Sequence, residues 1–418
     1  MKPEIIFIIE EFDTNGMFQT IEDKYKSICQ SKPDNWYYIN KNLWADVVGN
    51  KIKFQTYSSI TTFDPSVKYF YFCPLFVQRL DWFKFRTMLS DDKYRNLIEN
   101  NVILIFNDDC EALPWIKYDF FNYLLEWLWD CSGYVAARIC FMSMAKLLPS
   151  HNNFISHYFH NKFKFLYSPL ALKRMNNELE EYNFNEIFDS YLNSVKQKQF
   201  INLNLNPRFN RQLLLHSLRA HKLMEEGYVS YGRKDFRRLT IDNLKCSNTN
   251  YFNLIKKDME TELELMFVDE IDPEEPIKTS LTIPKNLMDK SCYDIVSETV
   301  PPYEIDGTFD QTVITEKIIK SLYFGRPFLV NGGPYVLETL RELGFKTCDW
   351  LFDESYDQEL NLLDRQEKIV KNVQRYVGKY NELWQKITAN LSVLEHNHNR
   401  MKNFNFELEL YKNLRNVI

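Results

Sequence analysis

Short apolar runs alternate with helical patterns along the first half of the chain. Four runs have the length and nearly continuous apolar character of strands buried on both faces of a sheet. They are IIFIIEE (5–11), KYFYFCPLF (68–76), NVILIFND (101–108) and ARICFMS (137–143). Between them, 92–100 and 118–130 have helical periodicity. The pattern therefore predicts a parallel α/β layer.

A long charged segment with helical periodicity, 168–199, precedes a second series of elements. Strands are predicted at 200–206, 291–298 and 327–333, and helices at 211–227, 315–324 and 335–344. An acidic, proline-rich stretch at 269–286 is typical of a surface loop. After Asp364 the pattern is largely helical to the end. The second half is therefore predicted to form another parallel layer with a helical C-terminus.

Length and composition fit two globular units. The 418 residues exceed what one core usually organises, and 45% of them are hydrophobic. We predict an N-terminal Rossmann-like domain at 1–195, a C-terminal Rossmann-like domain at 196–365, and C-terminal helices at 366–418 that pack back on both. The domain crossing is placed near residue 195.

Charge and cysteine usage bear on compartment and partners. The net charge of −6 gives no global attraction to nucleic acid or to an anionic membrane. The eight cysteines are scattered singly, which is typical of buried thiols in a reducing compartment. The first apolar run turns acidic too soon for a signal peptide, and Arg138 and Lys146 interrupt the longest one. We expect a cytoplasmic protein without a membrane partner; the abundance of Asn, Lys and Ile suggests that it is virus-encoded.

Several common chemistries lack their motif. The glycine-rich dinucleotide turn, a complete phosphate loop, His-Glu-x-x-His, Asp-x-Asp and Gly-x-Ser-x-Gly are all missing. His151, His157 and His160 cluster without a carboxylate or thiol at ligand spacing, so a surface or packing role is favoured over metal binding. No cofactor and no metal site is predicted, and hydrolase and phosphoryl-transfer mechanisms are disfavoured.

Polar residues gather at the predicted carboxyl end of strand 291–298, where open α/β sheets bind ligands. Ser297, Glu298 and Thr299 end this strand. The next helix has Thr315 as its expected N-cap, followed by Glu316 and Lys317. A cation at a helix N-terminus is locally unfavourable, so an anion such as a phosphate would compensate both Lys317 and the free N–H groups. The alternative is an exposed ion pair that contributes little.

A second cationic turn precedes helix 211–227. Arg208 and Arg211 flank a strand-to-helix turn in NLNLNPRFNRQLLLHSL (202–218), where planar guanidinium groups can hold a diphosphate bidentately. Two solvated arginines on a surface turn remain the alternative interpretation.

These motifs resemble those of a glycosyltransferase family common in phages and bacteria. Residues 309–357 are similar to its donor-binding core. The family has a strand ending in Glu-Thr, then Thr-Glu-Lys opening a helix, then Gly-x-Pro-Phe, and this chain has each in the same order at 298–299, 315–317 and 325–328. The segment ITEK (314–317) also resembles the sugar-nucleotide motif of fucosyltransferases. The resemblance implies the GT-B arrangement, an α/β fold of two Rossmann-like domains facing across a cleft.

The resemblance also implies roles for individual residues. Glu298, Thr315, Glu316 and Lys317 would contact a nucleotide-diphosphate sugar, with Thr299 beside them at the strand end. Arg208 and Arg211 would contact its phosphates. The donor would be a substrate rather than a cofactor, and inversion by single displacement is expected.

The acceptor side matches no family. A base is needed to take the acceptor proton, and Asp13 and Asp109 are the favoured candidates among the acids at N-terminal strand ends. The acceptor is expected to be a glycan, a protein or a hydroxymethylated base in phage DNA. For DNA, the basic segment 232–238 could bind phosphates, although a solvated helix face is the favoured interpretation of it. The alternative function is a non-catalytic module that binds a nucleotide sugar or glycan.

Overall fold

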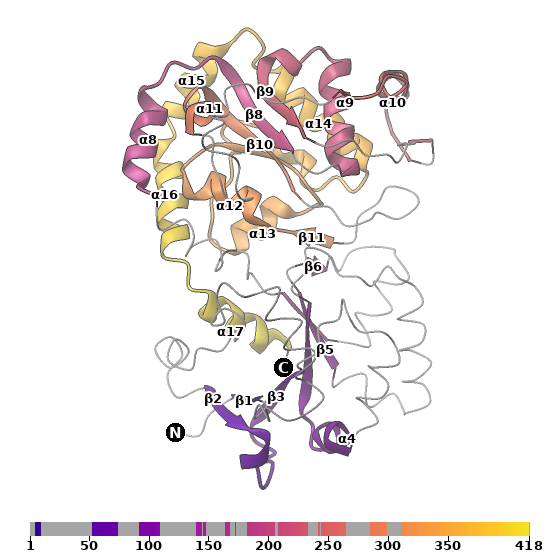
Figure 1. Ribbon diagram of the computed structural model, residues 1–418, viewed down its shortest axis with the longest axis vertical. Helices are drawn as coiled ribbons and strands as arrows, with labels where there is room; N and C mark the ends of the chain where they lie inside the picture. The colour runs from indigo at the N-terminus through magenta and orange to yellow at the C-terminus, as the bar shows by residue number, and fades with distance from the viewer. Residues whose placement is uncertain are drawn as a thin grey trace.

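The computed structural model is a mixed α/β protein with parallel sheets and a helical C-terminus (Figure 1). It describes residues 5–9, 52–73, 92–108, 139–143, 145–147, 164–167, 172, 182–204, 208–232, 241–242, 244–264, 285–298 and 311–417. The predicted mixed α/β class is confirmed.

The first half of the chain forms a six-stranded parallel sheet in the order β2-β1-β3-β4-β5-β7. Its strands are β1 (Ile5–Ile9), β2 (Ile52–Thr56), β3 (Lys68–Cys73), β4 (Ile103–Asp108), β5 (Ile139–Ser143) and β7 (Lys164–Tyr167). Helix α4 (Asp92–Glu99) precedes β4. The four predicted strands and the helix at 92–100 are confirmed, whereas the helix predicted at 118–130 lies outside the described residues.

The second half forms a four-stranded parallel sheet in the order β12-β10-β8-β9. Its strands are β8 (Lys198–Asn204), β9 (Gly227–Tyr231), β10 (Ser291–Ser297) and β12 (Phe328–Asn331). The chain passes from β8 through α9 (Phe209–Ala220) to β9, and then returns to place β10 on the other side of β8. The strand order therefore reverses between β8 and β10, and such a switch point is where open α/β sheets bind ligands.

Two helix predictions were wrong at their ends. The helix predicted at 211–227 stops at Ala220, because Lys222 adopts a left-handed backbone with φ of 60° and β9 follows. This left-handed position is usually glycine, so no local stop signal marks the end of the helix. Within the stretch of helical periodicity at 168–199, the described residues form α8 (Phe184–Asn193), and β8 already begins at Lys198.

The helix predicted at 315–324 is confirmed as α12 (Glu316–Tyr323), with Thr315 as its N-cap. Four of its apolar side chains are buried in the core: Ile318, Ile319, Leu322 and Tyr323. Gly325 follows the helix with φ of 62°, as expected of a C-terminal glycine. After β12 comes α13 (Val336–Glu342), near its predicted place.

Two connections join the halves of the chain. β6 (Ala145–Leu147) pairs antiparallel with β11 (Gln311–Val313) between the two larger sheets (Figure 1). The last helix, α17 (Phe406–Val417), reaches β7, where Asn413 Nδ2 donates to the carbonyl of Tyr167 at 2.9 Å. Buried side chains of both sheets also belong to one continuous hydrophobic cluster. Separation of the two sheets would therefore expose apolar surface.

The remaining helices surround the four-stranded sheet (Figure 1). They are α10 (Thr249–Asp258), α11 (Lys285–Asp289), α14 (Leu362–Gln374), α15 (Tyr380–Thr388) and α16 (Leu391–Lys402). The helical C-terminus expected after Asp364 is confirmed. Among the described residues, no helix has both the length and the apolar character to cross a membrane.

Arg326 fixes the amino half of β10 to its surrounding helices. Its side chain is 0% exposed, and its Nε donates to Asp294 Oδ1 at 2.7 Å. The other guanidinium nitrogens donate to the carbonyl of Met288 and the hydroxyl of Ser291, at 2.6 and 2.8 Å. Ser321 of α12 donates to the second oxygen of Asp294 at 2.7 Å. These contacts hold the amino half of β10 against α11 and α12.

Replacement of Arg326 by Met should destabilise the protein by about 3–5 kcal/mol, because Asp294 would keep a largely buried charge without its partner. Urea denaturation measures this change. Lys256→Met is the control, since it removes an exposed ion pair with Asp242 and should change stability by less than about 1 kcal/mol. Equal losses in the two variants would contradict the assigned role of Arg326.

Candidate functional site

Polar side chains at the carboxyl edge of the four-stranded sheet bond one another across its strands. Asn202 on β8 donates to the carbonyl of Ile295 at 2.6 Å and to the hydroxyl of Ser297 at 3.1 Å. Asn331 at the end of β12 donates to the same hydroxyl at 3.3 Å. All three polar side chains are buried. Since buried polar groups need partners, this network fixes the edge at which the predicted site residues lie.

Glu298 follows β10 and holds the start of α12. Its Oε1 accepts from the backbone N–H groups of Thr315 at 3.0 Å and Ile318 at 3.3 Å. Its Oε2 accepts from the Thr315 hydroxyl. The side chain is 0% exposed, and burial raises the pKa of Glu298 against the opposing charge of Lys317. A carboxylate of the chain itself thus compensates the positive helix end.

Glu316 and Lys317 lie at the partly open side of this helix start, with side chains 20% and 24% exposed. Lys317 Nζ is 2.9 Å from both Glu316 Oε1 and the Thr315 hydroxyl oxygen, and 3.9 Å from Glu298 Oε2. Burial pushes the pKa of Glu316 upward, but the charge and hydrogen bond of Lys317 outweigh it, so the net pKa is lowered. The ammonium therefore has carboxylate partners within the chain.

The first turn of α9 meets the same strand end. Asn210 Nδ2 donates to the backbone carbonyls of Glu298 and Asn331, both at 3.1 Å. Arg208 is exposed and occupies the N-cap position, whereas Arg211 is buried. The N-termini of α9 and α12 consequently converge on the end of β10, and both dipoles favour an anion there.

A residue of the other sheet contributes to this region. Tyr167 ends β7, and burial is the largest cause that raises its pKa well above the ordinary value. The charges of Glu342 and Glu298 raise the pKa further. The charge of Glu298 thus acts on the phenol of a residue in the other sheet.

The predicted site residues divide into two groups. Arg208, Arg211, Glu298, Thr315, Glu316 and Lys317 lie around the end of β10, directly or through Asn210. Asp13, Asp109, Thr299, the histidines at 151–160 and the basic residues 233–238 lie outside the described residues. The predicted base therefore stays a prediction, as does the solvated face favoured for the basic segment.

Sequence analysis missed Asn210 and Asn331, which connect the two helix starts. A usable signal was present, because asparagines recur at positions 202, 204, 206 and 210 around the predicted strand end. Asparagine is depleted in strands, so its repetition at a strand end indicates a demand for hydrogen bonds. The carbonyl groups that accept these hydrogen bonds are determined by how α9 packs over β10 and β12.

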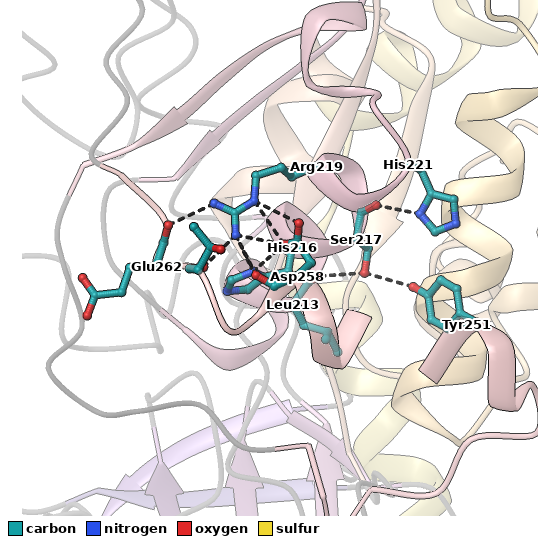
Figure 2. A network of polar contacts seen from close by, with 9 residues as sticks. Leu213, His216, Ser217, Arg219, His221, Tyr251, Asp258 and Glu262 are labelled. Carbon is teal, nitrogen blue, oxygen red and sulfur yellow. Dashed lines mark hydrogen bonds and ion pairs between the residues drawn. The ribbon is translucent and has the colours of Figure 1, made fainter. Parts of the chain in front are cut away.

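A cluster of Ser217, His216 and Asp258 contains the residue types of a hydrolase triad (Figure 2). His216 Nδ1 is 2.8 Å from Asp258 Oδ2, and Arg219 also binds that carboxylate. The Ser217 hydroxyl, however, donates to the carbonyl of Leu213 at 2.7 Å and accepts from Tyr251 at 2.9 Å. The bonds drawn in Figure 2 join α9 to α10 and the turn after it, so we interpret the cluster as a structural clamp.

No group of three or more His, Cys, Asp or Glu residues suited to a metal ion occurs in the described parts of the chain. The carboxylates at the candidate site already accept hydrogen bonds from Thr315 and Lys317. The arrangement offers cations and helix N-termini to an anionic ligand.

Acidification should weaken the clamp between α9 and α10. Burial is the largest cause that lowers the pKa of His216, and the charge of Arg219 lowers it further. The hydrogen bond and charge of Asp258 raise it, but the net pKa stays below its ordinary value. Stability gained from neutral His216 is therefore complete above about pH 6.5 and is lost as the pH falls through the lowered pKa. His216→Gln should flatten the decline in unfolding free energy between about pH 6.5 and 5, measured by urea denaturation.

The matched control is His221→Gln, because His221 lies at the end of the same helix and contacts only the carbonyl of Ser217 among the hydrogen bonds of Figure 2. This variant keeps the contact between His216 and Asp258, so the decline attributed to His216 should persist. If His216→Gln also kept it, protonation of His216 would not be what weakens the clamp.

No protein-family description matches the chain, and no curated protein matches it.

Proposed function

We propose that this protein is a glycosyltransferase with a GT-B-like arrangement, in which two Rossmann-like domains face one another across a cleft. It would move a sugar from a nucleotide-diphosphate sugar to an acceptor hydroxyl. The observation that carries this proposal is the partly exposed Glu316–Lys317 pair, held at the carboxyl edge of a parallel sheet beside its switch point. Ligands of open α/β sheets bind at this position.

The chemistry of a nucleotide-diphosphate sugar suits these groups. Its diphosphate is an anion that Lys317 and the N-termini of α9 and α12 would attract. Glu316 would accept a hydrogen bond from a ribose or sugar hydroxyl. Arg208 is exposed at the N-cap of α9, where its guanidinium can reach a phosphate.

The transfer would be a single displacement with inversion. The acceptor oxygen forms a bond to the anomeric carbon as the bond from that carbon to the diphosphate oxygen breaks. A base takes the acceptor proton, and Asp13 and Asp109 stay the proposed candidates. Lys317 and the arginines would stabilise the charge that develops on the leaving diphosphate. We propose a metal-independent reaction because the sequence has no Asp-x-Asp motif.

The acceptor is proposed by chemical class. We propose a glycan, a protein or a hydroxymethylated base of phage DNA as acceptor, in the cytoplasm of the cell that makes the protein.

Donor binding can be tested by thermal shift against UDP-, GDP-, ADP- and CMP-sugars. A donor at 100 times its dissociation constant should stabilise the protein by about 2.7 kcal/mol. Lys317→Ala should weaken this binding about 10- to 100-fold, because a hydrogen bond to a charged group contributes roughly 1.5–3 kcal/mol. Glu316→Ala should weaken binding of the whole donor more than binding of the free diphosphate, since its expected partner is a hydroxyl group.

Lys285→Ala is a matched control. Lys285 starts α11 and pairs with Glu186 at 2.8 Å, but it lies at the opposite, amino end of β10. Donor binding should be unchanged in this variant. Donor binding without sugar release or transfer would favour the alternative of a non-catalytic binding module, and no shift with any donor would contradict the proposal.

A further inference from the structure

We propose that Glu298 is a positioning residue that aims the Lys317 ammonium at the diphosphate of the donor, without touching the donor itself. This inference rests on the proposed function and changes the role that the sequence resemblance implied for Glu298. A fully buried carboxylate cannot exchange its bonds for those of a ligand unless α12 moves.

The backbone of Glu298 is fixed from two sides. Its N–H donates to the carbonyl of Asn331 at 3.0 Å, which extends the pairing between β10 and β12. Its carbonyl accepts from Asn210 Nδ2 of α9 at 3.1 Å. A Cβ added to Gly332 would lie 3.2 Å from the Glu298 Cβ, so the residue that follows β12 also lies close by. The backbone contacts of Glu298 therefore fix the direction in which its side chain extends toward α12.

The carboxylate then connects to Lys317 through one hydroxyl. Thr315 Oγ1 donates its proton to Glu298 Oε2, and this leaves its lone pairs to accept from Lys317 Nζ at 2.9 Å. Meanwhile Glu298 Oε1 binds the backbone N–H groups of Thr315 and Ile318, on either side of Lys317 in the sequence. One buried acceptor thus fixes both the backbone that carries Lys317 and the hydroxyl that holds its ammonium.

Exposure separates the residue that would meet the ligand from the residue that orients it. The Lys317 side chain is 24% exposed and the Glu298 side chain is 0% exposed. The ammonium lies 3.9 Å from Glu298 Oε2, which is farther than a hydrogen bond but close enough for charge attraction. A diphosphate can therefore approach Lys317 from the open side while Glu298 remains behind it.

Positioning and simple charge predict effects of opposite sign for Glu298→Gln. By charge alone, loss of a carboxylate near the ammonium would tighten the binding of an anion. By positioning, the amide would present an N–H group to Thr315 Oγ1 in place of an acceptor. The hydroxyl would lose its acceptor, and Lys317 would no longer be held toward the ligand. We infer that the loss of position dominates.

The experiment is a double-mutant cycle in which isothermal titration calorimetry measures the affinity of each variant for inorganic pyrophosphate. Lys317→Ala should weaken pyrophosphate binding at least tenfold, and Glu298→Gln at least fivefold. The double variant should bind no more weakly than Lys317→Ala, because Glu298 acts through Lys317. Binding by Glu298→Gln that equals or exceeds the wild type, or losses that add in the double variant, would overturn the inference.

A second pair of variants tests the same connection without changing charge. Thr315→Val removes the hydroxyl and should weaken pyrophosphate binding as Glu298→Gln does. Thr315→Ser keeps it and should bind pyrophosphate more tightly than Thr315→Val. Equal affinities of these two variants would overturn the role of the hydroxyl.

Asp294→Asn is the stability control. It removes a carboxylate from the same strand, at the Arg326 contact, and should lower the melting temperature without changing pyrophosphate affinity. A similar loss of affinity in this variant would overturn the inference, because general destabilisation would then explain Glu298→Gln. Absence of pyrophosphate binding by the wild type would also overturn it. Failure of the proposed function looks different: pyrophosphate would bind in a manner dependent on Lys317, but no nucleotide sugar would bind or react.

Discussion

The buried carboxylate of Glu298 requires hydrogen-bond donors, and the first turn of α12 supplies them. The two groups complement one another, since the helix start carries unsatisfied N–H groups and a partial positive charge. Their contact joins the end of β10 to α12 and thereby determines where Glu316 and Lys317 emerge. A shift of α12 along the sheet would leave both the carboxylate and the N–H groups without partners.

The same edge also depends on asparagine side chains. An amide can donate and accept at once, so Asn202, Asn210 and Asn331 can connect strands and helices that a hydrophobic contact would leave free to slide. Asn210 is the decisive member, because it brings α9 to the carbonyls that end β10 and β12. The candidate site therefore consists of a buried hydrogen-bond network and the partly exposed Glu316–Lys317 ion pair that it positions.

The two sheets are coupled more closely than two independent layers would require. The β6–β11 pairing, the contact of α17 with β7 and a shared hydrophobic cluster all cross between the two halves of the chain. Tyr167 extends this coupling to the neighbourhood of Glu298. Residues far apart in the sequence therefore contribute to one region, as expected for a site built at the edge of a sheet.

The sequence by itself determined strands β1, β3, β4, β5, β8, β10 and β12, the helical C-terminus and both ends of α12, because apolar periodicity, an N-cap threonine and a C-terminal glycine are local signals. It also selected Glu298 and Lys317, although the anion expected beside Lys317 was a phosphate. Only the tertiary structure decided that carboxylates of the chain already lie there, since a contact between β10 and α12 depends on packing rather than on spacing. The end of α9 was unpredictable for a related reason: Lys222 adopts the backbone conformation that glycine usually marks.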